Sequence, residues 1–191
     1  KIQPGENRVA STPDVASKLI KSGFQVYVEK DAGLNAGYTN EMYEKAGAKV
    51  VDLNELYSSA DVVVKVQRPL DHPIAGKNEL DLLNEGTILI TFLYPLNYPD
   101  LAQKCAGKKI NVISMDMIPR TTLAQKMHAL SSQANIAGYK SVIMCADALG
   151  KIFPLLMTAA GTISAAKVVI MGAGVAGLQA LGTAKRLGAV V

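Results

Sequence analysis

The sequence predicts an α/β fold with two Rossmann-like, parallel-sheet lobes and a cleft between them. Two observations lead to this prediction: short apolar strand patterns alternate with helix patterns through residues 12–113, and a glycine-rich turn follows another apolar run at residues 168–177. Strands that alternate with helices are typical of parallel sheets. The 191 residues suffice for two lobes, but the second is expected to be incomplete in this chain.

Composition excludes several classes of protein. Hydrophobic residues make up 49% of the chain and charged residues 19%, which excludes disordered and fibrous proteins. The net charge of +4 comes from bases scattered among acids, so it gives no support to a nucleic-acid groove. Cys105 and Cys145 fit neither a metal site nor a disulfide framework, and reduced, buried thiols are expected. No uninterrupted apolar run reaches the roughly 20 residues of a membrane-spanning helix.

The first lobe is predicted to alternate helices and strands. Thr12 is a hydroxyl N-cap and Pro13 occupies the first helical position, while Gly23 ends that helix. A second helix begins at Asn40 and ends at Gly47. Strands are expected at residues 24–29, 48–51, 62–64, 87–92 and 110–113. The apolar runs at 62–64 and 87–92 are typical of parallel strands buried on both faces.

A long helix is predicted from Thr121 to about Leu149, because apolar residues recur there at helical spacing without a proline. We place the domain boundary near Ile118, so that residues 1–118 form the first domain and residues 119–191 begin the second. Small residues on this helix, Gly138 among them, would let another backbone approach closely. The chain starts at Lys1 rather than Met and stops in an apolar run, so it is expected to be part of a longer protein.

The sharpest local signal is a G-x-G-x-x-G turn formed by Gly172, Gly174 and Gly177. It is predicted to follow a strand at 168–172 and to open a helix, with another strand at 189–191. In dinucleotide-binding proteins the first glycine permits the tight turn, the second admits the pyrophosphate, and the third lets helix and strand pack closely. The acid that would select NAD or NADP lies about 20 residues further on, beyond this chain, so the motif itself leaves both open.

Other polar residues allow two interpretations each. Arg8 suits either an anion contact or a surface ion pair, and Lys65, at a strand end, suits either a cleft or solvent. Gln125, His128 and either Ser131 or Ser132 would share one face of the long helix, which is either a solvated surface or the wall of a cleft. The sequence shows no Ser-His-Asp trio, metal-binding cluster or phosphate-binding Walker lysine. Hydride transfer between two nicotinamide rings requires none of these, because the protein supplies approach, orientation and exclusion of water.

Several blocks, in order along the chain, together resemble one family. These blocks are Glu6–Ala10, Val64–Val66, Met115–Arg120, Ala129–Tyr139, Thr158–Gly161 and Met171–Ala180. They resemble the NAD(H)-binding component of proton-translocating NAD(P) transhydrogenase, whose sister family is alanine dehydrogenase. The resemblance implies hydride transfer between NAD(H) bound here and NADP(H) on a partner domain, coupled to proton movement through a membrane domain. It also implies a homodimer and a soluble domain peripheral to the membrane complex, on the cytoplasmic face in bacteria or the matrix side in a mitochondrion-type organelle.

The resemblance also implies roles for individual residues. Arg120 and Gln125 match residues at the reaction site. The residues that match cofactor contacts are Arg120, Thr121, Thr122, Leu123, Gln125, Ser131, Gly172, Gly174, Val175, Ala176 and Gly177. One departure is His128, which stands where this family usually has aspartate, so no role is transferred to it.

Position 94 favours transhydrogenase over the sister family. Alanine dehydrogenases place a catalytic histidine where this chain has Tyr94. Converting an imine to an amine needs a proton donor of near-neutral pKa, and tyrosine is a poor replacement. Arg8 and Lys65, which hold the keto acid in the dehydrogenases, persist here. An alanine dehydrogenase-like oxidoreductase and a non-catalytic NAD-sensing module therefore remain the alternatives.

Overall fold

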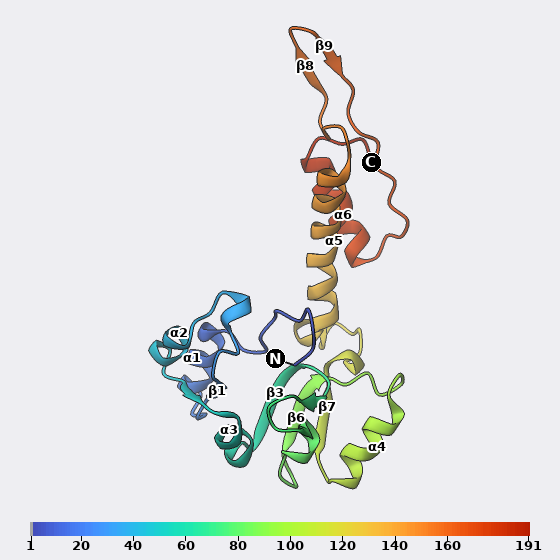
Figure 1. The fold of residues 1–191 in the computed structure, drawn as a ribbon. Coiled ribbons are helices and arrows are strands. Elements are labelled where there is room, and N and C mark those ends of the chain that lie inside the picture. Colours follow the sequence, from blue (N-terminus) through green and yellow to red (C-terminus); the bar gives the residue numbers. More distant parts are fainter. Residues whose placement is uncertain (1) are drawn as a thin grey trace. The chain divides into compact units, whose positions relative to one another are not determined.

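The computed structural model describes residues 2–191 and divides into two compact units (Figure 1). The first unit ends at Ile118 and the second is Pro119–Val191. Parallel sheets with helices confirm the predicted α/β class. Among the described residues, no helix is both long and apolar enough to span a membrane.

One part of the first unit is a two-stranded parallel sheet with three helices. Its elements are β1 Tyr27–Glu29, β2 Lys49–Val51, α1 Pro13–Lys21, α2 Asn40–Lys45 and α3 Leu53–Ser59, with the 3-10 helix η1 Leu34–Ala36 between β1 and α2. The Thr12 hydroxyl accepts a hydrogen bond from the N–H of Val15 at 3.4 Å, which confirms the predicted N-cap. The fully buried Ala16 and Tyr43 pack in the core between these elements.

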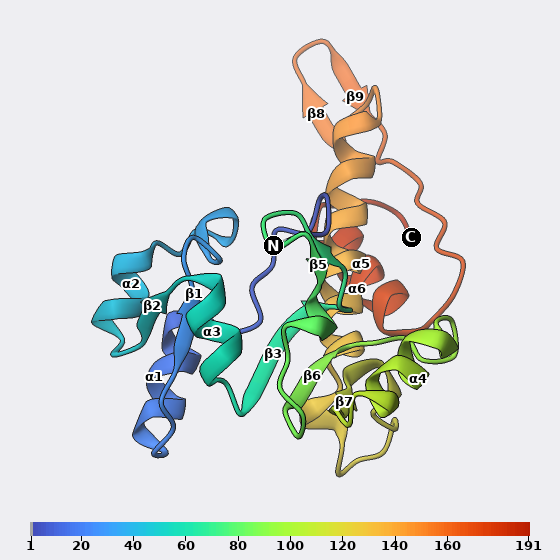
Figure 2. The same cartoon turned by 60° about the horizontal axis from the view of Figure 1, so that its bottom comes forward.

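The other part is a three-stranded parallel sheet in the order β3-β6-β7 (Figure 2). Its strands are β3 Val62–Gln67, β6 Ile88–Phe92 and β7 Asn111–Ser114, and α4 Pro99–Gly107 connects β6 to β7. Between β3 and β6 lie the hairpin β4 Asp71–His72 and β5 Lys77–Asn78 and the 3-10 helix η2 Glu79–Asp81, while η3 Met115–Met117 follows β7. The buried core of this part includes Val63, Leu80, Leu89 and Cys105.

Three predictions for the first unit need correction. The first strand begins at Tyr27 rather than at Phe24, whose side chain is exposed. Strand β3 is not buried on both faces, because Val62 and Val64 are 42% and 48% exposed while Val63 is buried. It also runs on to Gln67, so Lys65 lies within the strand rather than at its end.

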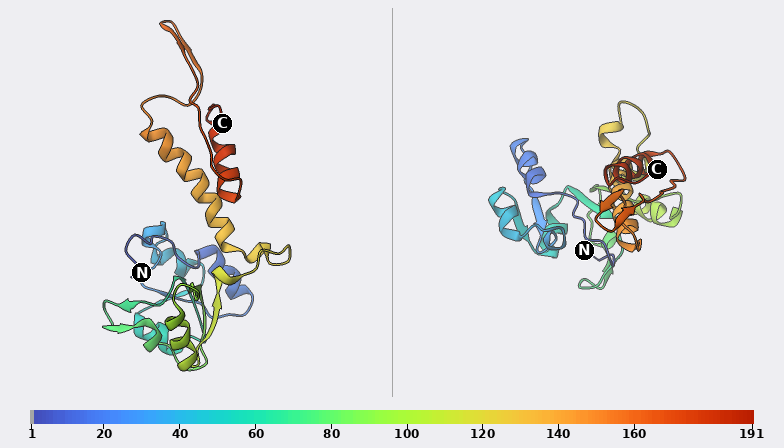
Figure 3. Two further views of the ribbon diagram at one scale, coloured as in Figure 1. Left: turned by 90° about the vertical axis from the view of Figure 1, so that its right-hand side faces the viewer. Right: turned by 90° about the horizontal axis from the view of Figure 1, so that it is seen from above.

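In the second unit, two helices pack side by side and a hairpin extends from them (Figures 1 and 3). The elements are η4 Gln125–Met127, α5 Ala129–Ala148, β8 Leu156–Thr158, β9 Gly161–Ile163 and α6 Val175–Arg186. The core of this unit joins Val142 of α5 to Ala180 and Ala184 of α6. All six residues of the antiparallel hairpin β8–β9 are exposed.

The second unit corrects other predictions. The long helix begins at Ala129 rather than Thr121, because local hydrogen bonds form a turn first: the Thr121 hydroxyl accepts from the N–H of Ala124, and η4 follows. The strands expected at 168–172 and 189–191 are reduced to one parallel bridge between Lys167 and Val190. Cys145 is exposed, so only the Cys105 thiol is buried as expected.

Candidate functional site

The glycine turn leads directly into α6. Gly172 has φ 110°, a left-handed conformation that a side chain rarely adopts. A Cβ on Gly177 would lie 2.9 Å from the carbonyl carbon of Gly172 and closer still to its oxygen, so the third glycine allows the close packing that the motif predicts. A Cβ on Gly174 would meet nothing within 4 Å, so space is open beside the second glycine.

The N-terminus of α6 has the properties of an anion site. Gly174 is the N-cap and supplies no side-chain hydrogen bond to the first turn of the helix. The first N–H groups of a helix have no partner within it, and the helix dipole places partial positive charge there. No acidic side chain lies in this first turn. The turn can therefore hold a phosphate group through backbone N–H groups.

The segment from Arg120 to Met127 forms an exposed turn before α5. The side chains of Arg120, Thr121, Thr122 and Gln125 are exposed, and Leu123 is 93% exposed. Only Ala124 is buried within this turn. Gln125 lies in η4, so the prediction that it shares a helix face with His128 and Ser131 is wrong.

His128 and Ser131 meet at the start of α5. The Nδ1 atom of His128 accepts a hydrogen bond from the N–H of Ser131 at 3.1 Å, which makes this histidine the N-cap. The Ser131 hydroxyl oxygen lies 2.7 Å from the same nitrogen. His128 is buried. The sequence pattern placed these residues near each other but did not reveal the cap.

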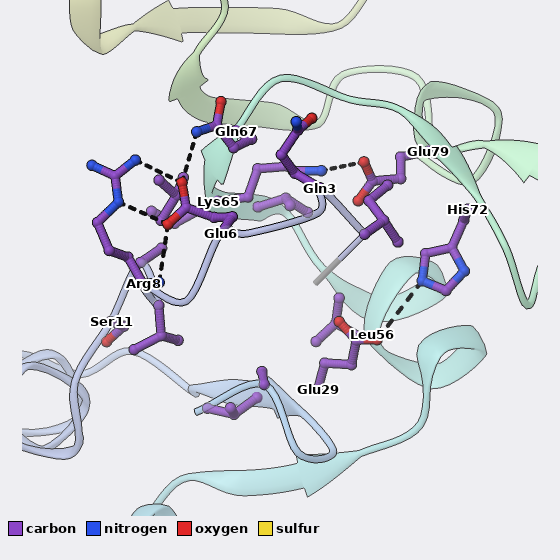
Figure 4. Close-up of a pocket in the computed structure, with 18 of the residues that line it drawn as sticks. Gln3, Glu6, Arg8, Ser11, Glu29, Leu56, Lys65, Gln67, His72 and Glu79 are labelled. Carbon is purple, nitrogen blue, oxygen red and sulfur yellow. Dashed lines mark hydrogen bonds and ion pairs between the residues drawn. The ribbon is translucent and has the colours of Figure 1, made fainter. Parts of the chain in front are cut away.

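The first unit contains a cavity of about 170 Å³ that includes Arg8 and Lys65 (Figure 4). None of the residues predicted to bind the cofactor lines it. Its polar lining comes from the N-terminal segment, β1, α3, β3, β4 and η2: Gln3, Glu6, Arg8, Ser11, Tyr27, Glu29, Tyr57, Lys65, Gln67, His72 and Glu79. No group of three or more potential metal ligands occurs in the described part of the chain.

Glu6 is the centre of one polar cluster in this cavity. Its carboxylate accepts two hydrogen bonds from the Arg8 guanidinium, at 2.8 and 2.6 Å, and one from the Gln67 amide at 2.7 Å (Figure 4). The hydrogen bonds from Arg8, aided by Gln67, outweigh desolvation and lower the pKa of Glu6 to about 2. The same pair raises the pKa of Arg8. Of the two interpretations of Arg8, an anion contact or an ion pair, the structure supports the ion pair.

Glu79 is the centre of the second cluster. It pairs with the Lys65 ammonium, accepts from the Tyr57 hydroxyl at 2.9 Å and accepts from the N–H of Leu70 at 2.9 Å. Burial lowers the pKa of Lys65 although Glu79 opposes this, and burial raises the pKa of Tyr57. Lys65 therefore faces the cavity rather than solvent, with its charge compensated by Glu79.

His72 of β4 is buried and lines the same cavity. Its Nδ1 accepts from the N–H groups of Ile74 and Ala75, at 3.3 and 3.4 Å. Its Nε2 lies 3.8 Å from a carboxylate oxygen of Glu29. Sequence reasoning missed Glu29 and both central carboxylates, although Glu6 stands only two residues from Arg8.

Comparison with known proteins identifies the family. The model of the N-terminal domain of alanine dehydrogenase/PNT matches residues 2–137, and that of the C-terminal domain matches residues 141–191. The chain belongs to the alanine dehydrogenase/PNT family. Within it, the chain is 45% identical over 190 residues to an NAD(P) transhydrogenase alpha subunit component of Rhodospirillum rubrum, covering 99% of this chain and 49% of the relative. It is 33% identical over 193 residues to alanine dehydrogenase of Bacillus subtilis, covering 100% and 49%.

Solved structures of this family confirm the Rossmann-like fold. Transhydrogenase from Sinorhizobium meliloti superposes with a TM-score of 0.93 at 43% identity, over 100% of this chain and 55% of that chain. An L-alanine dehydrogenase superposes with a TM-score of 0.83 at 31% identity, over 99% and 51%. The chain thus spans about half the length of these relatives, and it is more similar to the transhydrogenases than to the dehydrogenases among them.

Position 94, where the two branches of the family are expected to differ, has an unusual backbone. Tyr94 has φ 54°, and its N–H donates to a carboxylate oxygen of Asp116 at 3.1 Å. That carboxylate also accepts from the Ser114 hydroxyl at 2.6 Å. The ring of Tyr94 stacks on Phe92, with centroids 6.1 Å apart. Asp116 and Ser114 thus hold this turn at the carboxyl end of β6, a contact that the sequence pattern did not predict.

Proposed function

We propose that this chain supplies the NAD(H)-binding part of an NAD(P) transhydrogenase. The observation that carries the proposal is the N-terminus of α6, which follows the three-glycine turn and has no side-chain hydrogen bond to its first N–H groups. Its N–H groups suit the pyrophosphate of a dinucleotide. The similarity to transhydrogenase alpha subunits, at 45% identity, supports this choice over the dehydrogenase branch. The activity of the whole complex is part of the proposal, because the chain spans about half of these relatives.

The proposed cofactor site has two parts, both in the second unit. Gly172, Gly174, Val175, Ala176 and Gly177 would hold the pyrophosphate. At the nicotinamide end the proposed contacts are Arg120, Thr121, Thr122, Leu123, Gln125 and Ser131. NAD(H) supplies or accepts the hydride when it is bound. Arg120 and Gln125 are assigned to the reaction site, where their exposed side chains can orient the ring and help exclude water.

The second nucleotide, NADP(H), is assigned to a partner domain that approaches the turn of residues 120–127. A membrane domain of the complex would couple hydride transfer to proton translocation. This chain would then lie peripheral to the membrane, on the cytoplasmic face in bacteria or the matrix side in a mitochondrion-type organelle. We also propose that it forms a homodimer, which the exposed hairpin β8–β9 supports.

One experiment separates this proposal from its alternatives. The full-length protein with its NADP(H)-binding partner is given NADH and an NADP analogue, and separately NADH, pyruvate and ammonium. Transhydrogenation in the first mixture supports the proposal. Oxidation of NADH only in the second would show an alanine dehydrogenase-like enzyme, an alternative that the cavity with Arg8 and Lys65 favours. NADH binding without turnover in either mixture would show an NAD-sensing module.

Replacing Gln125 tests the reaction site itself. Gln125→Ala should slow hydride exchange at saturating nucleotide by about tenfold or more while changing the NADH dissociation constant much less, because the side chain acts at the approach of the two rings. The rate is measured by stopped-flow absorbance and the affinity by NADH fluorescence. Gln103→Ala, an exposed glutamine on α4, is the control. An equal loss of rate and affinity, or no loss of either, would contradict this role.

A further inference from the structure

Helices α5 and α6 pack against each other through small or apolar residues that recur once per helical turn. The buried residues of α5 are Gly138 and Val142, four residues apart, and Ala180 and Ala184 of α6 have the same spacing. Residues at this spacing form ridges that pack one helix against another. These four residues form the seam between the two helices. Gly138 lies where the seam reaches the start of α6, and there it contacts Ala176.

Gly138 leaves no space for a side chain. A Cβ there would lie 2.9 Å from the carbonyl carbon and 3.0 Å from the Cα of Ala176, and closer still to the carbonyl oxygen. All three atoms are backbone, so no change of rotamer could relieve the contact. The helices would have to separate by roughly 1 Å to restore an ordinary contact distance.

Ala176 is also part of the glycine turn, between its second and third glycines. On the other side of the turn, Gly177 packs with similar closeness against the backbone of Gly172. The first N–H groups of α6 are therefore fixed between two glycine contacts, one within the turn and one supplied by α5. Displacing Ala176 from α5 would move those N–H groups.

Helix α5 also connects the two parts of the proposed cofactor site. It begins beside His128 and Ser131, and Gly138 follows seven residues after Ser131, which corresponds to roughly 10 Å along a helix axis. The contact with Ala176 therefore sets the position of the pyrophosphate turn relative to the residues assigned to the nicotinamide end.

We propose that Gly138 is a positioning residue of the dinucleotide site, a further glycine that acts together with the three of the turn although it lies on another helix. It acts through the backbone of Ala176 and does not touch the nucleotide. This inference rests on the proposed function and deepens it, since it concerns how the same site is held.

Gly138→Ala in the full-length protein tests the inference. Its dissociation constants for NADH and for ADP-ribose, which both contain the pyrophosphate, should rise by a similar factor of roughly ten to a hundred, the effect of losing one hydrogen bond to a charged group. Adenosine, which lacks the pyrophosphate, should bind as it does to the unaltered protein. Fluorescence titration measures NADH, and calorimetry measures the other two ligands.

Two control variants separate positioning from a general loss of structure. Gly182 lies in α6, on the other helix of the pair, and a Cβ there would meet nothing within 4 Å, so Gly182→Ala should not change the affinity for NADH. Val142→Ala removes buried side-chain atoms from the same seam and should lower the unfolding midpoint while leaving the ratio of NADH to adenosine affinity unchanged.

The outcomes are distinguishable. Unchanged NADH affinity in Gly138→Ala would overturn the inference, and so would an equal loss for adenosine or an equal shift of the affinity ratio in Val142→Ala. If the unaltered full-length protein fails to bind NADH, the proposed function fails instead. If Gly138→Ala does not fold at the assay temperature, the three affinities are measured on it at lowered temperature and judged by the same ratio.

Discussion

At the scale of single residues, two carboxylates organise the cavity of the first unit. Glu79 compensates the charge of Lys65, whose side chain is only 18% exposed. Glu79→Gln keeps one acceptor, for the Tyr57 hydroxyl, but leaves the ammonium buried without a counter-charge, so the protein should lose about 3 kcal/mol of unfolding free energy. Urea unfolding measures this loss. Glu85→Gln, which breaks the exposed pair with Lys109, should change little, and equal effects of the two variants would contradict the prediction.

Glu6 gives the first unit a specific sensitivity to acid. Its pKa falls from 4.5 to about 2 on folding, chiefly through the hydrogen bonds from Arg8. A carboxylate with a depressed pKa stabilises the fold above about pH 4.5, and this contribution is lost as the pH falls towards 2. Glu6→Gln should therefore flatten the decline in stability between pH 5 and about 2, measured by urea unfolding across that range. Glu44→Gln, on an exposed position of α2, should leave the slope as it was.

At the scale of elements, the sequence predicted those helix starts and strands that depend on residues close together in the chain. Thr12 and Pro13 placed the start of α1, and alternating apolar runs located most strands of the first unit. The beginning of α5 was placed eight residues too early because the turn at Thr121–His128 depends on side-chain hydrogen bonds that hydrophobic spacing does not reveal. The cavity clusters were missed for a related reason: Glu79 and Lys65 are brought together by the β4–β5 region. Their pairing is a property of tertiary structure.

The cap of α5 can be tested by two substitutions. His128→Ala removes the acceptor for the N–H of Ser131 and should lower the unfolding free energy by about 1 kcal/mol. His128→Asn should restore much of this stability, because the asparagine oxygen is a good N-cap acceptor. Urea unfolding gives the stabilities, and amide hydrogen exchange at Ser131 reports the cap directly. If the asparagine variant is as unstable as the alanine variant, the histidine stabilises α5 by another route.

At the scale of the whole molecule, the exposed hairpin β8–β9 offers a test of the proposed homodimer. A two-stranded hairpin is marginal in water without a packing partner, yet Met157 is 77% exposed and Ile163 42% exposed. In the proposed homodimer a second copy of the chain covers these side chains. Met157→Asp should then weaken the dimer by at least tenfold, because a carboxylate would be buried in an apolar contact. Analytical ultracentrifugation of the full-length protein measures the dissociation constant.

Ile74→Asp, which introduces the same charge at an 85% exposed position of the first unit, should leave the dimer intact. Equal weakening by both variants would indicate that charge rather than the hairpin governs association, and an unaltered protein that sediments as a monomer would exclude the dimer.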